Sequence, residues 1–260
     1  MTILNSAYRK WSFHDFRIRA QYDLQAKGGS VAEDTLFMNM GYWKDQPQSL
    51  DEASRALARL VAEMARLGKD DNILDVGCGF GDNALLWMEE FAPAKISLVN
   101  ISKKQLSVAG ERITQRGWSE RISLWVASAT ELPFEEGAFD KVTCVEASHD
   151  FDSREAFFLN AHKVLKPGGK LILADLLHPP ETRDTYLEKL QRAGFVNVDA
   201  RSIRQEVFDP FVDHLLRRAE KANPVSRWMT RAYIAYTKKT GVFQKLDFVI
   251  TTAERPSRPN

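Results

Sequence analysis

A short apolar run passes directly into three closely spaced glycines in the stretch Ile73-Leu74-Asp75-Val76-Gly77-Cys78-Gly79-Phe80-Gly81-Asp82. The run has the length of a buried strand, and glycines that follow a strand let the backbone turn tightly and approach a ligand closely. Asp82 then begins a segment, residues 82–91, with the pattern of a helix. The stretch therefore predicts a strand, a ligand-binding loop and a helix, which together are the first unit of an α/β fold.

Around this stretch the chain alternates between apolar runs of strand length and segments with helical periodicity. Ser49 and Glu52 fit a capping box, which predicts a helix over residues 50–67 that ends at Gly68. The other expected helices cover residues 82–91, 103–115, 153–165 and 186–193, and the expected strands cover 72–76, 96–101, 122–127, 141–146, 170–176, 196–203 and 246–253. This alternation predicts an α/β protein with a mostly parallel sheet and helices on both of its faces.

The spacing of the glycines distinguishes between possible cofactors. A dinucleotide site requires G-x-G-x-x-G, whereas here the third glycine comes one residue early. Asp75 precedes the first glycine by two residues, where its charge would repel a pyrophosphate but attract the ammonium group of a methionine moiety. The loop also lacks the Lys-Ser/Thr pair of a nucleoside triphosphate site. These features favour a cationic cofactor that carries an amino acid.

The loop and two later motifs resemble those of the class I S-adenosylmethionine-dependent methyltransferases. Asp75–Gly81 is similar to the family's first motif, and the later matches are Glu131-Leu132-Pro133-Phe134 with Gly137, Phe139 and Asp140, and Val164-Leu165-Lys166-Pro167-Gly168-Gly169. The likeness covers about residues 35–205 and is greatest to enzymes that methylate natural-product sugars and macrolides, quinones or lipids. It implies a Rossmann-like fold with a seven-stranded sheet, and S-adenosylmethionine as the cofactor.

The resemblance also implies which residues bind the cofactor. Gly41-Tyr42-Trp43 resembles an element that covers the cofactor in this subgroup. Two positions that are usually acidic hold neutral residues here, Asn100 at the ribose and Ser128 at the adenine, and neutral hydrogen bonds are weaker than charge-assisted ones. The expected cofactor-binding residues are Tyr42, Asp75, Gly77, Cys78, Gly79, Gly81, Asn100, Ile101, Gln105, Ser128, Ala129, Thr130 and Glu146.

A candidate catalytic group lies just past the fourth strand of the pattern. His149 has a side chain suited to proton abstraction, and Asp175, at the end of the next strand, could orient its imidazole. The subgroup includes sugar and macrolide O-methyltransferases with a histidine and an aspartate at these positions. Glu146 is the competing base, which would suit a carbon acceptor with an acidic proton. No metal ligands are expected.

The chain outside the core divides into further segments. We expect a helical N-terminal cap at residues 1–48, the cofactor-binding core at 49–205, a helical lid insertion at 206–245, and the last strand and tail at 246–260. The lid insertion is basic and contains aromatic residues, which would suit an anionic or apolar-ringed small-molecule acceptor. Its basic residues are Arg217, Arg218, Lys221, Arg227, Arg231, Lys238, Lys239 and Lys245, and its aromatic residues are Trp228, Tyr233 and Tyr236.

Composition excludes several other classes of protein. Lys and Arg number 36 against 35 Asp and Glu, so the chain has no charge excess that would draw it to nucleic acid. No apolar run approaches the ~20 residues that span a bilayer, so no membrane insertion is expected. The only two cysteines, Cys78 and Cys144, lie in apolar runs as expected for reduced, buried thiols. These features predict a cytoplasmic protein and are compatible with a homo-oligomer.

The sequence thus predicts methyl transfer from S-adenosylmethionine to a small molecule, with a hydroxyl of a natural product as the favoured acceptor. One alternative is a C- or N-methyltransferase for a prenyl, quinone or indole-like acceptor, which would not need His149. A second alternative is a cyclase or scaffold that keeps the fold and the cofactor but transfers no methyl group. The departures at Asn100 and Ser128 keep this second alternative open.

Overall fold

The computed structural model describes residues 4–6, 34–221 and 245–257, together with the single positions 228, 231, 232, 235 and 239. The expected sheet is present and has one additional strand at its edge. Its eight strands lie in the order β1-β4-β3-β2-β5-β6-β8-β7. Their bounds are β1 Leu4–Ser6, β2 Asn72–Val76, β3 Lys95–Asn100, β4 Ile122–Val126, β5 Phe139–Val145, β6 Leu165–Leu177, β7 Val196–Ser202 and β8 Asp247–Glu254.

The pairing of the strands confirms a mostly parallel sheet. Strands β1 to β6 pair in parallel, whereas β8 lies antiparallel between β6 and β7. β1 comes from the N-terminal segment and pairs with β4, a contact that the hydrophobic pattern did not predict. Strand β6 begins earlier than expected, because Gly168 donates its N–H to the Arg255 carbonyl and Gly169 accepts from the Arg255 N–H. Residues 166–169, which end the last of the three family-like motifs, are therefore part of the sheet.

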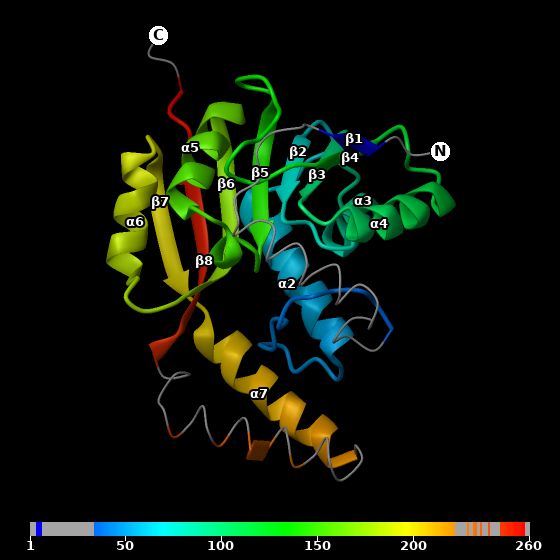
Figure 1. Ribbon diagram of the computed structural model, residues 1–260, viewed down its shortest axis with the longest axis vertical. Helices are drawn as coiled ribbons and strands as arrows, with labels where there is room; N and C mark the ends of the chain where they lie inside the picture. Colours follow the sequence, from blue (N-terminus) through cyan, green and yellow to red (C-terminus); the bar gives the residue numbers. More distant parts are fainter. Residues whose placement is uncertain are drawn as a thin grey trace.

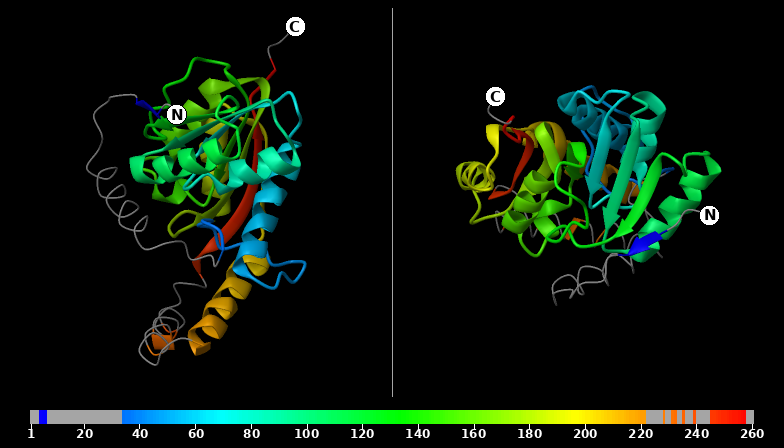
Figure 2. Two further views of the ribbon diagram at one scale, coloured as in Figure 1. Left: turned by 90° about the vertical axis from the view of Figure 1, so that its right-hand side faces the viewer. Right: turned by 90° about the horizontal axis from the view of Figure 1, so that it is seen from above.

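Helices cover both faces of the sheet, as predicted (Figure 2). Successive strand residues point to opposite faces, so Ile73 joins one hydrophobic cluster and Leu74 the other. The first cluster contains residues of α2, α3, α4 and α7, and the second contains residues of α5 and α6. The helix bounds are α2 Leu50–Ala65, α3 Asp82–Glu90, α4 Lys103–Gln115, α5 Arg154–Val164, α6 Arg183–Arg192 and α7 Arg204–Lys221, and Ser148–Asp150 form a short 3₁₀ turn, η1.

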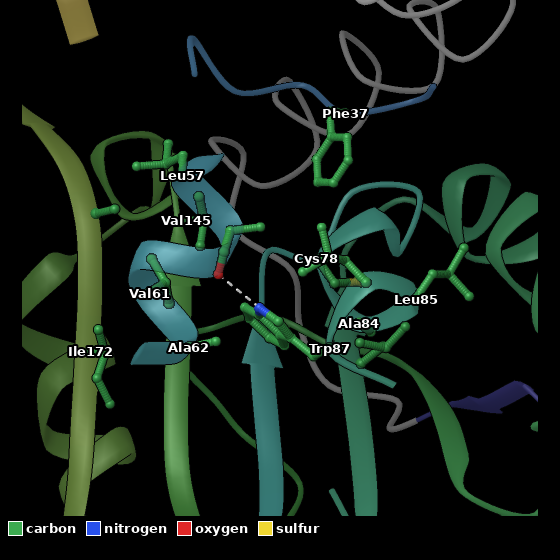
Figure 3. Packing of buried hydrophobic residues seen from close by; sticks show 14 of the residues in the cluster. Phe37, Leu57, Val61, Ala62, Cys78, Ala84, Leu85, Trp87, Val145 and Ile172 are labelled. Atoms are coloured by element: carbon green, nitrogen blue, oxygen red, sulfur yellow. Dashed lines mark hydrogen bonds between the residues drawn. The ribbon is translucent and has the colours of Figure 1, made fainter. Parts of the chain in front are cut away.

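The ends of α2 differ in detail from the expected caps. Ser49 Oγ accepts the Glu52 N–H at 3.2 Å, but the Glu52 carboxylate accepts from the N–H of Gln48 and not from that of Ser49. At the other end the helix stops at Ala65, because Arg66 takes the left-handed conformation that the sequence suggested for Gly68. Within the core, the indole N–H of Trp87 donates to the Ala58 carbonyl of α2 at 2.9 Å, the bond drawn in Figure 3.

Helix α7 projects away from the sheet (Figure 1) and forms the described part of the predicted lid insertion. It begins at Arg204 and contains Pro210. The expected helical N-terminal cap lies mostly outside the described residues, and its described parts, residues 4–6 and 34–48, contain strand β1 and no helix. Residues 34–48 instead run past the carboxyl ends of the strands, where the candidate site lies.

Candidate functional site

A cleft of ≈ 930 Å³, counted to its open mouth, lies at the carboxyl ends of β2, β3 and β5. This is the place where open parallel sheets bind their ligands. Its lining residues come from five parts of the chain, namely the segment before α2, the glycine loop with the start of α3, the end of β3 with the start of α4, the end of β4, and the end of β5 with η1. They are Leu36, Phe37, Met38, Asn39, Val76, Gly77, Cys78, Gly79, Phe80, Asp82, Asn83, Val99, Asn100, Ile101, Gln105, Ala127, Ser128, Ala129, Val145, Glu146, Ala147, Asp150 and Phe151.

The glycine loop requires its glycines for two different reasons. Gly77 has φ +76°, and a Cβ there would lie 2.3 Å from the Cβ of Ala147, so no side chain fits. Gly79 has φ +55°, and the atom nearest to a Cβ added there would be Met38 Sδ at 3.7 Å. A side chain at Gly77 would therefore disturb the core of the site, whereas a side chain at Gly79 would enter the cleft.

Asn100 and Gln105 form a hydrogen-bonded pair beside this loop. The Asn100 amide donates to Gln105 Oε1 at 2.8 Å and to the Gly79 carbonyl at 3.3 Å, and it accepts the Ser102 N–H. The Gln105 amide donates to Met38 Sδ at 3.2 Å, and a thioether is a weak acceptor. Both side chains line the cleft, so an amide pair occupies the place where the family usually has a carboxylate.

Asp75 lies behind the lining of the cleft and not on its wall. Its side chain is fully buried and accepts a hydrogen bond from Thr143 Oγ1 at 3.0 Å. Burial raises the pKa of Asp75 to about 7, although the hydrogen bond with Thr143 opposes this. The carboxyl group therefore supports the start of the glycine loop from behind, and the structure does not place it on the surface of the cleft.

The segment before α2 supplies a wall that sequence reasoning did not assign residue by residue. Leu36, Met38 and Asn39 line the cleft, and Phe37 also contacts the hydrophobic cluster that contains Cys78 (Figure 3). The apolar character of Leu36, Phe37 and Met38 was visible in the sequence, but only Tyr42 was selected there. Tyr42 is buried and does not line the cleft.

Asp82 is a further lining residue that sequence reasoning missed. It is the first residue of α3, and its carboxylate binds both terminal nitrogens of Arg112 at 2.6 and 2.7 Å. It also accepts the N–H of Leu36 at 3.3 Å. Its position directly after Gly81 was the available signal, because an acidic residue is favoured in the first turn of a helix.

His149 and Asp175 are brought together as predicted. The Nδ1 atom of His149 lies 2.5 Å from Oδ1 of Asp175, and the fully buried Asp175 also accepts the N–H groups of His149 and Leu176 and the hydroxyl of Ser148. Burial by itself would lower the pKa of His149, but the charge of Asp175 and its hydrogen bond raise that pKa to about 9. The pKa of Asp175 is held low by the imidazolium, against the effect of its burial.

The His149–Asp175 pair stands beside the cleft and not in its lining. Asp150, the next residue, does line the cleft, and its carboxylate lies 3.9 Å from Nε2 of His149. His178 is also near, with its ring centroid 5.6 Å from that of His149. The imidazole is thus fixed by Asp175 through Nδ1, while Nε2 is the nitrogen left for another group.

Glu146 directly follows β5 and has a conformation that is unusual for a residue with a side chain, with φ +49°. Its carboxylate lines the cleft and accepts the N–H of Met40 at 2.8 Å, so it holds the segment before α2. Burial raises the pKa of Glu146 to about 8, and the hydrogen bond from Met40 opposes this shift. Glu146 therefore connects two walls of the cleft.

The raised pKa of Glu146 predicts how its replacement changes stability with pH. A group whose folded pKa is raised from 4.5 to about 8 binds more protons in the folded state, so wild-type stability falls between these pH values. Glutamine has no proton to lose. At about 1.4 kcal/mol per pH unit, we therefore expect the free energy of unfolding of Glu146→Gln to rise relative to that of wild type by roughly 3–4 kcal/mol between about pH 5 and pH 8.

Urea denaturation at both pH values measures this gain. The matched control is Glu90→Gln, because the hydrogen bond with Arg59 lowers the pKa of Glu90, and this variant should not gain stability as the pH rises. A constant difference between Glu146→Gln and wild type across this range would contradict the assignment.

The structure brings nine of the predicted site residues into the lining of the cleft, and these are Gly77, Cys78, Gly79, Asn100, Ile101, Gln105, Ser128, Ala129 and Glu146. Gly81 and Thr130 adjoin lining residues in the chain without being part of the lining. Within the described part of the chain, no group of three or more His, Cys, Asp or Glu side chains is placed to hold a metal ion. None of the described helices is long and apolar enough to cross a membrane.

Comparisons with known proteins agree with this geometry. A family model described as a methyltransferase domain matches residues 74–173. The erythromycin 3''-O-methyltransferase of Saccharopolyspora erythraea is 31% identical over 277 residues, which cover 92% of this chain and 90% of that protein. The 27-O-demethylrifamycin SV methyltransferase of Amycolatopsis mediterranei is 34% identical over 143 residues, which cover 55% of this chain and 52% of its own.

The solved structures that resemble this chain share its fold. The crystal structure of the cyclase SpnF superposes with a TM-score of 0.75 at 24% identity and covers 94% of this chain and 97% of its own. At this identity the likeness concerns the fold alone. The erythromycin 3''-O-methyltransferase, which aligns over 92% of this chain, is a methyltransferase.

Proposed function

This chain belongs to the class I S-adenosylmethionine-dependent methyltransferases, which makes it an enzyme that transfers a methyl group to a small molecule, and we propose that it methylates a hydroxyl group of a natural product. The observation that carries the proposal is the 2.5 Å contact between His149 Nδ1 and Asp175 Oδ1 beside the cleft. A hydroxyl acceptor requires a base, and this pair provides one. The similarity to the erythromycin 3''-O-methyltransferase supports an oxygen acceptor.

The cleft is suited to S-adenosylmethionine in its shape and in its charge. The open space at Gly79 allows a ligand to approach the backbone, and the described lining residues include three acidic side chains, Asp82, Glu146 and Asp150, and no basic one. Carboxylates attract the sulfonium and ammonium groups of this cofactor. When bound, S-adenosylmethionine supplies an electrophilic methyl group on a positively charged sulfur.

Individual residues receive proposed roles from their positions. The backbone of Gly77–Gly79 would approach the methionine part, with Asp75 favouring its ammonium group from behind the loop. The amide pair of Asn100 and Gln105 would bind the ribose hydroxyls, and Ser128 and Ala129 would contact the adenine. These roles follow the family's arrangement and the lining of the cleft.

His149 is the proposed general base. The proton of the acceptor hydroxyl would pass to Nε2 of His149, while the Asp175 carboxylate holds the proton on Nδ1 and so fixes the tautomer. Arg154 lies 3.8 Å from Asp175 and keeps that carboxylate ionised. The enzyme therefore aligns the acceptor, removes its proton and excludes water from the cleft.

The pKa of His149 predicts a pH dependence of the reaction. Only the neutral imidazole accepts a proton, so kcat/KM should rise with pH and level off above about 9, the pKa of His149 in the free enzyme. Asp175→Asn removes the charge that raises this pKa, while burial continues to lower it. The level region should therefore begin at a lower pH in Asp175→Asn, although its maximum rate is reduced.

Initial rates measured from about pH 6 to pH 10 test this shift. The control is His162→Ala, because His162 does not line the cleft. A pH profile of kcat/KM that shifts in Asp175→Asn but not in His162→Ala would support the assignment. Identical profiles in wild type and Asp175→Asn would contradict it.

The proposed function itself is tested by incubating the protein with S-adenosylmethionine and a panel of hydroxylated macrolides, polyketides and their sugars. Mass spectrometry should detect a product heavier by one methyl group, and fragmentation should place that group on oxygen. Methylation of carbon or nitrogen would favour the first alternative and make Glu146 the base to test. Tight cofactor binding without any methylated product would favour a non-methylating protein with this fold.

We also propose the segment boundaries that the sequence suggested. The cap at 1–48 is supported by the contacts of residues 34–43 with the cleft, and the lid at 206–245 by the packing of α7 against α2 and β8. Arg227, Lys238, Tyr233 and Tyr236 of the lid lie outside the described residues. Cys78 and Cys144 are buried free thiols, which suits a cytoplasmic enzyme. We further propose that the acceptor is anionic or carries an apolar ring, and that the protein forms a homo-oligomer.

A further inference from the structure

Helix α7 carries a proline where a helix normally needs a donor. Pro210 is the seventh residue of α7, and it has no N–H to give to the carbonyl of Glu206, four residues earlier. Its ring also pushes that carbonyl away from the helix axis. The Glu206 carbonyl instead accepts the backbone N–H of Trp43 at 2.7 Å. Because Pro210 cannot donate to it, the Glu206 carbonyl is available to accept a hydrogen bond from the segment before α2.

Trp43 is also packed against α7 by its side chain. It is 8% exposed and forms a small cluster with Leu50 and Ala53 of α2, against which Phe211 of α7 packs. Its ring lies 5.1 Å from that of His214, on the next turn of α7. Trp43 is therefore attached to α7 both by its backbone and by its ring.

A second set of hydrogen bonds leads from Trp43 to the cleft. The indole N–H of Trp43 donates to the Met40 carbonyl at 2.8 Å, and the N–H of Met40 donates to the Glu146 carboxylate at 2.8 Å. Met38 and Asn39, directly before Met40, form part of the cleft wall, and Glu146 forms another part. A continuous series of contacts therefore runs from α7 through Trp43 and Met40 to Glu146.

We propose that Trp43 is a positioning residue that joins α7 to the wall of the cofactor cleft, with Pro210 supplying the carbonyl to which it is bound. The identity of the ligand in this cleft rests on the proposed function. A shift of α7 moves Trp43, and Trp43 moves the Met38–Met40 wall relative to Glu146. The position of the lid helix thereby sets how tightly the cofactor is enclosed.

Pro210→Ala tests the connection at its α7 end. The alanine N–H draws the Glu206 carbonyl back into the helix and weakens its bond to Trp43, while the helix itself gains a favourable residue. We expect the dissociation constant of S-adenosylhomocysteine to rise about three- to tenfold, the effect of losing one hydrogen bond. The thermal midpoint should stay unchanged or rise, which a merely structural role for Pro210 would not produce.

Trp43→Phe tests the connection at its second link. Phenylalanine keeps the backbone N–H and an aromatic ring against Phe211 but removes the indole donor to Met40. The cofactor product should again bind about three- to tenfold more weakly and dissociate faster. The matched control is Trp87→Phe, because Trp87 also donates its indole N–H to a backbone carbonyl and, like Trp43, does not line the cleft, but its acceptor is Ala58 of α2 and not the segment beside the cleft wall.

Calorimetry and stopped-flow measurements give the affinity and the dissociation rate of S-adenosylhomocysteine for each variant, and thermal unfolding gives its stability. Together they test the proposed connection. The proposal expects Trp87→Phe to lose stability and to keep its affinity, and Pro210→Ala and Trp43→Phe to lose affinity. Wild-type affinity and dissociation rates in both Pro210→Ala and Trp43→Phe would overturn it. A wild-type protein that binds no S-adenosylhomocysteine would overturn the proposed function itself.

Discussion

Replacing His149 with alanine is expected to lower kcat by about 10²–10⁴-fold, the usual contribution of a positioned general base. An alcohol is a poor nucleophile until its proton leaves, and Nε2 of His149 is the nitrogen that Asp175 leaves available. Glycine-loop residues and the segment before α2 form the cleft without this imidazole. Affinity for the cofactor should therefore change little in His149→Ala.

Methyl transfer followed by mass spectrometry gives the rate, and calorimetry with S-adenosylhomocysteine gives the affinity. His162→Ala is the matched control, since His162 is a half-buried histidine that does not line the cleft and should leave kcat unchanged. Full activity in His149→Ala would remove both the proposed base and the preference for oxygen as the acceptor. Glu146, on the wall of the cleft, would then be the next residue to replace.

The parts of the site that follow from local sequence were predictable. The glycines that follow one apolar run identify the carboxyl end of β2, and His149, just past another apolar run, identifies that of β5. These signals are visible in the sequence because side-chain pattern and turn chemistry are local properties. The contact between His149 and Asp175 also followed, since the ends of neighbouring parallel strands meet at one edge of the sheet.

The parts that depend on long-range packing were not predictable. Asp75 precedes the glycines by two residues, but its side chain is buried against the neighbouring strand β5, where it accepts a hydrogen bond from Thr143, 68 positions away. The bond between Met40 and Glu146 joins residues 106 positions apart, and no local pattern indicates it. The bond from Trp43 to the Glu206 carbonyl likewise joins distant segments, and it became evident only when α7 and the segment before α2 were seen together.

Gly79→Val is the second replacement with a large expected effect, namely a loss of affinity for S-adenosylmethionine of more than about 100-fold, or about 2.8 kcal/mol. The glycine has φ +55° and faces the cleft, with Met38 Sδ as the nearest atom at 3.7 Å from an added Cβ. A valine side chain would therefore occupy space that the cofactor needs. Gly77 is unsuitable for this test, because its Cβ would collide with Ala147 and disturb the fold.

Gly137→Val separates the blocked cleft from the strain of a valine in a left-handed conformation. Gly137 has φ +70°, a Cβ there would have no atom within 4 Å, and the residue does not line the cleft. Both variants carry a similar backbone cost, so both should lose similar stability on thermal unfolding. Only Gly79→Val should lose cofactor binding by calorimetry. Unchanged affinity in Gly79→Val, or an equal loss in Gly137→Val, would contradict the placement of the cofactor against this loop, because the two side chains differ in whether they enter the cleft.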